Sequence, residues 1–328
     1  MSKQVFYVGV DVGAHEVWGA VAGKRPRRYS HTTKGIRALH RWAKTEAGDA
    51  RLHLCMEATG VYSRQVAMNL IGQTDTDVSI VNPKCIKSFG EAQMRRAKTD
   101  RIDAEVIRCY AESQHPAVWR PEPEGLRRLY ALVAQADAIQ ASLHDWRNRH
   151  HAQDYTPDIP AAVRTSQRTI ERALQRQLTR VEQAIDQVIA ADSSLAQQVM
   201  VLQTIPGIAR KSAARIAAYG GRWLTERSQK ELVAHAGLAP HHHQSGTSVR
   251  GRSRIDKRGD RRLRKALYMP ALVGIVHNPV LKTFYQRLVD NHKPKMVALI
   301  ACMKKLLLIC RSMLINKNCF NPQYQHLT

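Results

Sequence analysis

The 328-residue sequence has few acidic residues for its many basic ones and no long apolar stretch. Its apolar runs, such as residues 306–310, are far shorter than the roughly 20 residues that a membrane-spanning helix needs. No signal-type apolar core follows the N-terminus, and the six cysteines form no Cys-x-x-Cys pair. These absences argue against a membrane-spanning or secreted protein, so we expect reduced thiols in a cytoplasmic protein.

The sequence has an excess of positive charge. It contains 51 Lys and Arg against 27 Asp and Glu, a net charge of +24 at pH 7 with neutral histidines. This charge favours a polyanionic partner, because binding to phosphates releases condensed counterions. Nucleic acid is the expected partner, and a membrane surface is the weaker alternative. The length is enough for a large core and suggests about two domains.

A first strand is predicted at residues 5–13, VFYVGVDVG. The apolar residues at even positions from Phe6 to Val12 share one face, so that face is buried. A hydrophobic core does not explain Asp11 near the strand end, because burying an unpaired carboxylate costs several kcal/mol. Asp11 therefore either lies at a solvated strand end or binds a metal ion.

The segments that follow alternate between strand and helix patterns. Strand-like runs are predicted at residues 17–22, 29–33, 51–56 and 78–81, and helical spacing separates the last three of them. Glu57 directly follows one of these runs and so stands at a strand end, as Asp11 does. Three strands, helix, strand, helix, strand is the order of an RNase H-like sheet, a mixed α/β fold.

Two more acids, Asp100 and Asp103, begin a predicted helix for which Thr99 is the expected cap. Their spacing of three places both carboxylates on one helical face, where like charges repel unless a divalent cation lies between them. The alternative is that both residues only favour the positive end of the helix. Four acids at two strand ends and one helix start are harder to explain without a metal ion.

Two long helices with heptad-like spacing are predicted at residues 125–151 and 170–188. The connector at residues 154–160 contains Pro157 and Pro160, so it is not helical throughout, and an antiparallel hairpin or a broken helix is expected. The heptad leucines mediate either self-association or packing within the chain.

Residues 202–221 contain Ile-Pro-Gly-Ile between two short amphipathic segments. This pattern resembles a helix-hairpin-helix motif, in which a tight turn and the next helix N-terminus offer backbone N–H groups to a phosphate. Arg210 and Lys211 are the expected phosphate contacts. The alternative is a plain turn between two core helices.

Residues 244–265 begin as a Ser/Gly loop and run into the most basic segment of the chain. Few acids at i+4 balance its charges, so a phosphate-binding surface is favoured over a solvated face. The expected nucleic-acid contacts are Arg250, Arg252, Arg254, Lys257, Arg258, Arg261 and Arg262. The preceding His241–His243 run and His235 are interpreted as phosphate contacts rather than metal ligands, because adjacent side chains point in different directions.

The assembled pattern resembles the bridge-RNA-guided DEDD recombinases, or transposases, of bacterial insertion sequences. The resemblance covers nearly the whole chain and rests on seven ordered motifs: GVDVG, MEATGVY, AKTDRIDA, IPGI, AGLAP, SGTSVRG and ALYMPA. Thr247 is a departure, since serine is also common at that position of the family loop.

The resemblance implies a RuvC-like catalytic domain at residues 1–122, a helical coiled-coil segment at 123–194 and a mainly helical transposase domain at 195–328. It further implies that Asp11, Glu57, Asp100 and Asp103 hold Mg²⁺, for which Mn²⁺ can substitute. Ser245 matches the family's nucleophilic serine. A bacterial protein of this kind is expected in the cytoplasm, at the nucleoid.

The partners implied by the resemblance are target and donor DNA, a structured guide (bridge) RNA encoded by the element, and further copies of the chain. Dimers that assemble into a tetrameric synaptic complex are expected, in which one subunit's carboxylates work with another's serine. Two alternatives stay open. One is a metal-dependent hydrolytic nuclease of the Holliday-junction resolvase type, and the other is a non-catalytic nucleic-acid-binding protein.

Overall fold

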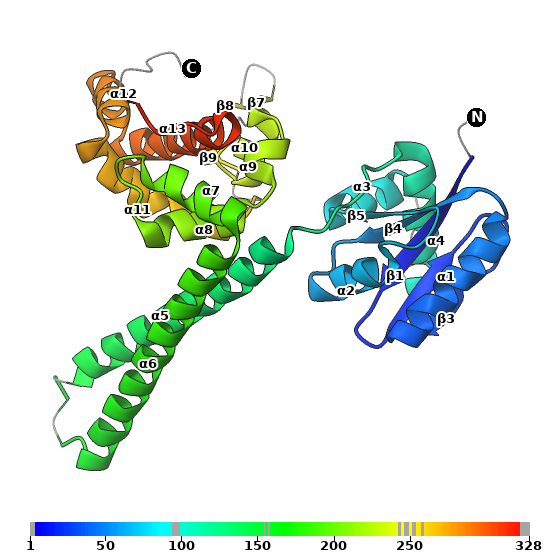
Figure 1. Ribbon diagram of the computed structural model, residues 1–328, viewed down its shortest axis with the longest axis horizontal. Helices are drawn as coiled ribbons and strands as arrows, with labels where there is room; N and C mark the ends of the chain where they lie inside the picture. The colour runs from blue at the N-terminus through cyan, green and yellow to red at the C-terminus, as the bar shows by residue number, and fades with distance from the viewer. Residues whose placement is uncertain are drawn as a thin grey trace. The chain divides into compact units, whose positions relative to one another are not determined.

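The structure is a computed structural model that describes residues 4–93, 99–153, 155–156, 158–241, 244–245, 249–250, 254–256 and 259–321. The chain forms two compact units, Met1–Pro121 and Glu122–Thr328 (Figure 1). The boundary expected between residues 194 and 195 falls inside the second unit. Among the described helices, none combines the length and the apolarity needed to cross a membrane.

The first unit is built on a five-stranded sheet with the order β3-β2-β1-β4-β5. Strands β1 (Val5–Val12), β2 (Glu16–Ala20) and β3 (Arg27–Ser30) form an antiparallel meander. Strands β4 (Arg51–Glu57) and β5 (Thr76–Val81) continue the sheet in parallel with β1. The mixed α/β sheet predicted from the sequence is therefore confirmed, with β1 at its centre.

Helices cover both faces of this sheet. Helices α1 (Thr33–Ala47) and α2 (Val61–Leu70) pack on the face formed by the even residues of β1, where Val8, Val10 and Val12 are buried. Helix α4 (Asp100–Gln114) packs on the opposite face, together with α3 (Pro83–Ala92). The odd residues of β1, including Asp11, therefore face α4, because strand side chains alternate between the two faces.

Helix α3 was not predicted, although its start carries two clear signals. Asn82 caps the helix, since its side-chain oxygen accepts a hydrogen bond of 2.9 Å from the backbone N–H of Lys84. Pro83 occupies the first helical position, where a missing N–H costs nothing. The sequence interpretation treated Asn82 and Pro83 only as the end of a strand.

The second unit begins with an antiparallel pair of long helices, α5 (Glu124–Gln153) and α6 (Ala161–Ala191), which lie side by side in Figure 1. Leu178 of α6 is buried against Ala136, Ile139 and Leu143 of α5. The break between the two helices falls in the predicted connector. The structure selects the hairpin over a broken helix and uses the heptad residue Leu178 within the chain.

The remaining helices share one core with the base of the hairpin. They are α7 (Ser193–Gln203), α8 (Arg210–Gly220), α9 (Trp223–Glu226), α10 (Gln229–His235), α11 (Arg261–His277), α12 (Pro279–Asp290) and α13 (Lys295–Asn316). The turn between α7 and α8 places Gly207 at φ +102°, against α11. A Cβ there would lie 2.8 Å from the carbonyl oxygen of Pro270, so this turn requires glycine.

The segment before α11 contains short strands where a Ser/Gly loop was expected. β6 (Pro240–His241) pairs with β9 (Arg254–Ile255), and β7 (Gln244–Ser245) pairs with β8 (Val249–Arg250), both antiparallel. The expectation of a loop was wrong for these paired residues, because strands of two residues are too short to show a periodic pattern in the sequence.

Candidate functional site

Two of the four predicted acids stand side by side at the carboxyl end of the sheet. The register of the parallel strands β1 and β4 pairs Val10 with Met56, and the next residues are Asp11 and Glu57. Glu57 follows Cys55 by two residues, and Cys55 packs in the core on the α4 side of the sheet. Both carboxylates therefore face α4 from neighbouring strands.

Helix α4 runs antiparallel to β1 and in close contact with it. Near the start of β1, the Tyr7 hydroxyl lies 2.7 Å from Nδ1 of His115, just after the end of α4. In the middle of β1, a Cβ on Gly9 would collide with the carbonyl oxygen of Ala104 and the backbone of Arg108. One turn further, the first turn of α4 reaches the level of Asp11. Glycine at position 9 permits this approach.

The first turn of α4 supplies the other two acids. The side chain of Thr99 caps the helix by accepting a hydrogen bond of 3.3 Å from the N–H of Ile102, as predicted. Asp100 and Asp103 both lie in this turn. The structure thus brings Asp11, Glu57, Asp100 and Asp103 together from two strand ends and one helix start.

The pKa of Asp11 reflects the proximity of the other three acids. Burial, followed by the nearby charges of Asp100, Asp103 and Glu57, raises the pKa of the Asp11 carboxyl from 3.8 to about 6. A hydrogen bond from the N–H of Val12 opposes the shift. Ionisation of Asp11 is costly because the group is buried beside three other acids. A cation bound there would offset this cost by stabilising the ionised carboxylates.

The donor set fits a hard divalent cation, since Mg²⁺ and Mn²⁺ prefer carboxylate oxygens. The described side chains do not already form a closed cage: no three described His, Cys, Asp or Glu residues lie close enough to share one metal ion. The fit therefore rests on ligand chemistry and on the raised pKa of Asp11.

His31 lies at the same end of the sheet and was not singled out in the sequence. Its Nδ1 lies 2.6 Å from the carbonyl oxygen of Gly13, two residues after Asp11, so the ring donates to this carbonyl. Its Nε2 is buried without a hydrogen-bond partner among the described residues, as is Oγ1 of Thr59 after β4. An isolated histidine with no motif around it gives no sequence signal.

The predicted nucleophile Ser245 belongs to the second unit. It ends β7, where it pairs with Val249 of β8, and its side chain lies outside the described part of the structure. The same holds for the side chains of Arg250, Arg252 and Arg254 and for residues Lys257 and Arg258.

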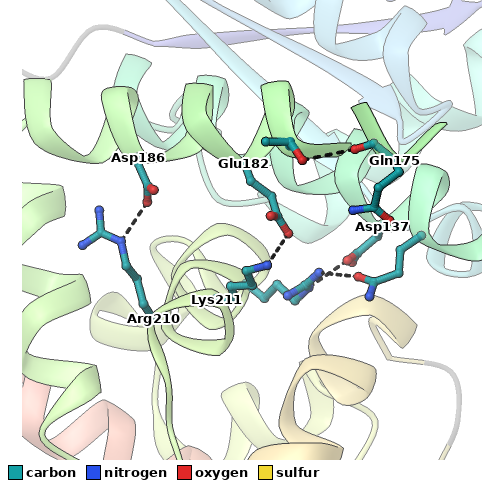
Figure 2. Close-up of polar contacts among 9 residues, drawn as sticks. Asp137, Gln175, Glu182, Asp186, Arg210 and Lys211 are labelled. Carbon is teal, nitrogen blue, oxygen red and sulfur yellow. Dashed lines mark hydrogen bonds and ion pairs between the residues drawn. The ribbon is translucent and has the colours of Figure 1, made fainter. Parts of the chain in front are cut away.

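Arg210 and Lys211 begin α8, as predicted, but both are ion-paired to α6. Arg210 Nε lies 2.7 Å from Oδ1 of Asp186, and Lys211 Nζ lies 2.6 Å from Oε1 of Glu182 (Figure 2). A third pair, Arg215 to Asp137 of α5 at 2.7 Å, continues the row. The acids of the hairpin thus occupy positions on α8 that phosphates would take.

The described cations at the start of α11 differ in their surroundings. Arg262 donates to the hydroxyl of Tyr130 and lies over the rings of Tyr130 and Tyr219. Arg261 and Lys265 both line a groove of about 1290 Å³. His235 stacks on Trp223 at 4.2 Å, and burial lowers its pKa, which disfavours the expected protonated phosphate contact.

Family comparisons match both units. A DEDD transposase model of the IS110 type matches residues 8–153, which include all four acids. A second model, the transposase IS116/IS110/IS902 family, matches residues 199–286, which include Ser245.

Relatives extend this match to nearly the whole chain. The pilin gene-inverting protein of Moraxella bovis is 30% identical over 320 residues, covering 94% of this chain and 95% of the relative. Its counterpart from Moraxella lacunata matches to the same extent. An uncharacterized 43.6 kDa protein of insertion element IS110 from Streptomyces coelicolor is 28% identical over 35% of this chain. The chain therefore belongs to the IS110 family of DEDD transposases and is a DNA recombinase of that family.

Proposed function

We propose that this recombinase cleaves and exchanges DNA strands with a RuvC-like Asp-Glu-Asp-Asp metal site and a serine nucleophile, under the guidance of an RNA. The observation that carries the proposal is that Asp11, Glu57, Asp100 and Asp103 lie at one end of the first unit's sheet, where burial and the charges of the other three acids raise the pKa of Asp11. A non-catalytic binding protein would have no use for four acids so placed.

Asp11 at the centre and Glu57, Asp100 and Asp103 around it would hold Mg²⁺ or Mn²⁺. When bound, the metal would polarise the scissile phosphate and stabilise charge on the attacking and leaving oxygens. The protein's own contribution is rigidity, because two adjacent strand ends and a capped helix start fix the backbone of all four ligands.

Ser245 is proposed as the nucleophile. Its Oγ would form a bond to phosphorus while the bond from phosphorus to one deoxyribose oxygen breaks, and its proton would pass to a base as the leaving oxygen gains one. The phosphoserine ester keeps the energy of the broken bond, so that a new DNA end can displace the serine. Serine needs activation, and the four acids, supplied across a domain or subunit interface, are the candidate activators.

The alternative of simple hydrolysis by water is disfavoured by the relatives, two of which are named for inverting a pilin gene. Inversion joins strands as well as cutting them. The guide RNA is supported by the family resemblance and by the net charge of +24, and assembly into dimers and tetramers is proposed from the same resemblance.

A covalent adduct between protein and DNA tests the serine. Labelled DNA substrate is incubated with the wild type, Ser245→Ala and Ser248→Ala, and a slow-migrating, protease-sensitive band is sought on a denaturing gel. The wild type and Ser248→Ala should form the band and Ser245→Ala should not. If Ser245→Ala forms it, or if the wild type cuts only to free ends, the resolvase-type alternative is the better description.

Metal dependence is tested separately. Asp11→Asn and Asp103→Asn should lose strand cleavage by more than about 100-fold and keep nucleic-acid binding, because they remove ligand charge and leave the basic surfaces intact. Glu91→Gln is the matched control, since Glu91 is an exposed acid of the same unit that is paired with Lys87. Cleavage that persists in excess chelator would contradict the metal site.

The RNA is tested by purifying the protein with and without ribonuclease and sequencing whatever RNA accompanies it. One structured RNA in large excess over cellular background is the expected result. Full recombination by RNA-free protein would refute guidance by RNA.

A further inference from the structure

A groove of about 720 Å³ lies on the first unit between α1 and the end of α2. Lys34, Arg37 and Arg41 of α1 line one wall, and Asn69 and Gln73 line the other, with the buried side chain of Leu70 between them. This groove is not part of the carboxylate site, because α1 and α2 pack on the sheet face opposite the one that Asp11 and α4 share.

The cations of the groove form a row. Positions i, i+3 and i+7 share one face of a helix and span about 10 Å along its axis. All three residues are exposed. None of them takes part in the ion pairs found between described residues. The described residues that line the groove include no carboxylate either. Three unbalanced positive charges in one concave surface repel one another, a cost that bound anions would remove.

The remaining titratable side chain of the groove, His40, adds no charge near pH 7. Its Nε2 lies 2.9 Å from Oγ1 of Thr76, and burial, followed by the charge of Lys44, lowers its pKa. The positive potential of the groove therefore comes from the three α1 cations. Opposite them, the amide of Gln73 adds neutral donors, and Asn69, whose Nδ2 donates to the carbonyl oxygen of Gln65 at 2.9 Å, keeps one further N–H.

We propose that this groove binds the phosphate backbone of a nucleic acid, with residues other than the four carboxylates and the basic segment at residues 244–265. This inference rests on the proposed function. A row of cations about 10 Å long spans two to three successive phosphates of one strand. Because the groove and the acids lie on opposite faces of the sheet, the groove holds a segment other than the scissile phosphate.

The test replaces Lys34, Arg37 and Arg41 together by Gln in the full-length protein and measures binding of a labelled DNA duplex and of a labelled structured RNA across a range of salt concentrations. Loss of three phosphate contacts should weaken binding at 50 mM salt by about 10- to 100-fold and reduce the slope of log K against log salt by about 2 to 3. Loss confined to one probe assigns the groove to that nucleic acid.

The matched control replaces Lys24, Arg28 and Lys87 by Gln. It removes the same charge from the same unit, but these cations are paired with Glu46, Glu16 and Glu91. The control should change affinity less than about threefold. The inference would be overturned if the two triple variants lost affinity equally. It would also be overturned if the groove variant bound both probes as tightly as the wild type does. The proposed function is tested separately, by the cleavage and adduct assays on the wild-type protein.

Discussion

Nζ of Lys211, near the start of α8, lies 2.6 Å from Oε1 of Glu182 on α6, and the neighbouring Arg210 pairs in the same way with Asp186. Two cations that the sequence assigns to phosphate thus face two carboxylates one helical turn apart (Figure 2). If α8 contacts nucleic acid, phosphates must compete with these acids.

Removal of the competing acids should therefore strengthen nucleic-acid binding. Glu182→Gln combined with Asp186→Asn is expected to raise affinity a few-fold at low salt, since exposed ion pairs contribute about 0.2–1 kcal/mol each. Fluorescence anisotropy with labelled DNA measures it. Glu171→Gln, which breaks the pair with Arg147 further along α6, is the control. Unchanged or weaker binding would remove α8 from the interface.

Gly9→Ala should displace α4 from the sheet. The added methyl group would lie 2.9 Å from Cα of Arg108 and closer still to other backbone atoms, none of which rotates away. We expect a loss of about 1–3 kcal/mol in unfolding free energy and a larger loss of cleavage, because Asp100 and Asp103 move with the helix. Gly90→Ala in α3 is the control, since its Cβ would make an ordinary contact of 3.5 Å with Val106.

Asp11→Asn should stabilise the metal-free protein at neutral pH. The folded state raises the pKa of Asp11 from 3.8 to about 6, so the folded state binds its proton more tightly than the unfolded state does. The resulting penalty is absent below pH 4, grows as pH rises to 6, and is full above that. Asparagine has no charge and removes this penalty. The gain in unfolding free energy is at most about 3 kcal/mol, and solvent screening reduces it.

Thermal unfolding in chelator at pH 4 and pH 7.5 checks this prediction. The melting temperature of Asp11→Asn should exceed that of the wild type at pH 7.5 only. An equal or lower value at pH 7.5 would mean that the Asp11 carboxylate is compensated in the folded protein.

Leu178→Ala should weaken the α5–α6 hairpin. Leu178 is 7% exposed and packs within the chain, so its truncation is expected to cost about 2–4 kcal/mol in the unfolding of the second unit. Leu174→Ala should cost less, because Leu174 is only partly buried. Denaturant unfolding followed by circular dichroism compares them. Light scattering on Leu178→Ala shows in addition whether the hairpin also joins subunits, by a fall in mass without unfolding.

Neutralisation of Arg250, Arg252 and Arg254 together should flatten the salt dependence of nucleic-acid binding. Each lost phosphate contact releases about one fewer counterion, so the slope of log K against log salt should fall by about 2 to 3. The melting temperature reports on the fold of the variant. An unchanged slope would identify the segment as a solvated surface.

The local sequence determined the elements of the first unit and the types of its site residues. Alternation in residues 5–13 fixed β1, and Thr99 fixed the start of α4, because caps and side-chain periodicity act over a few residues. Asn82 and Pro83 carried an equally local signal for the start of α3, but they were interpreted only as the end of the preceding strand. The acids Asp11, Glu57, Asp100 and Asp103 were recognisable for the same reason, as carboxylates at the ends of elements.

The tertiary structure decided which of these residues meet and which cations are already engaged. The approach of α4 to Gly9 depends on backbone packing between residues about 95 apart in the chain, and no spacing in the sequence encodes it. Arg210 and Lys211 looked free in the sequence because Asp186 and Glu182 lie 24 and 29 residues away. The row on α1 became a groove only when the end of α2 packed beside it. Local patterns specify elements, whereas the contacts between elements follow from burial of their apolar faces against one another.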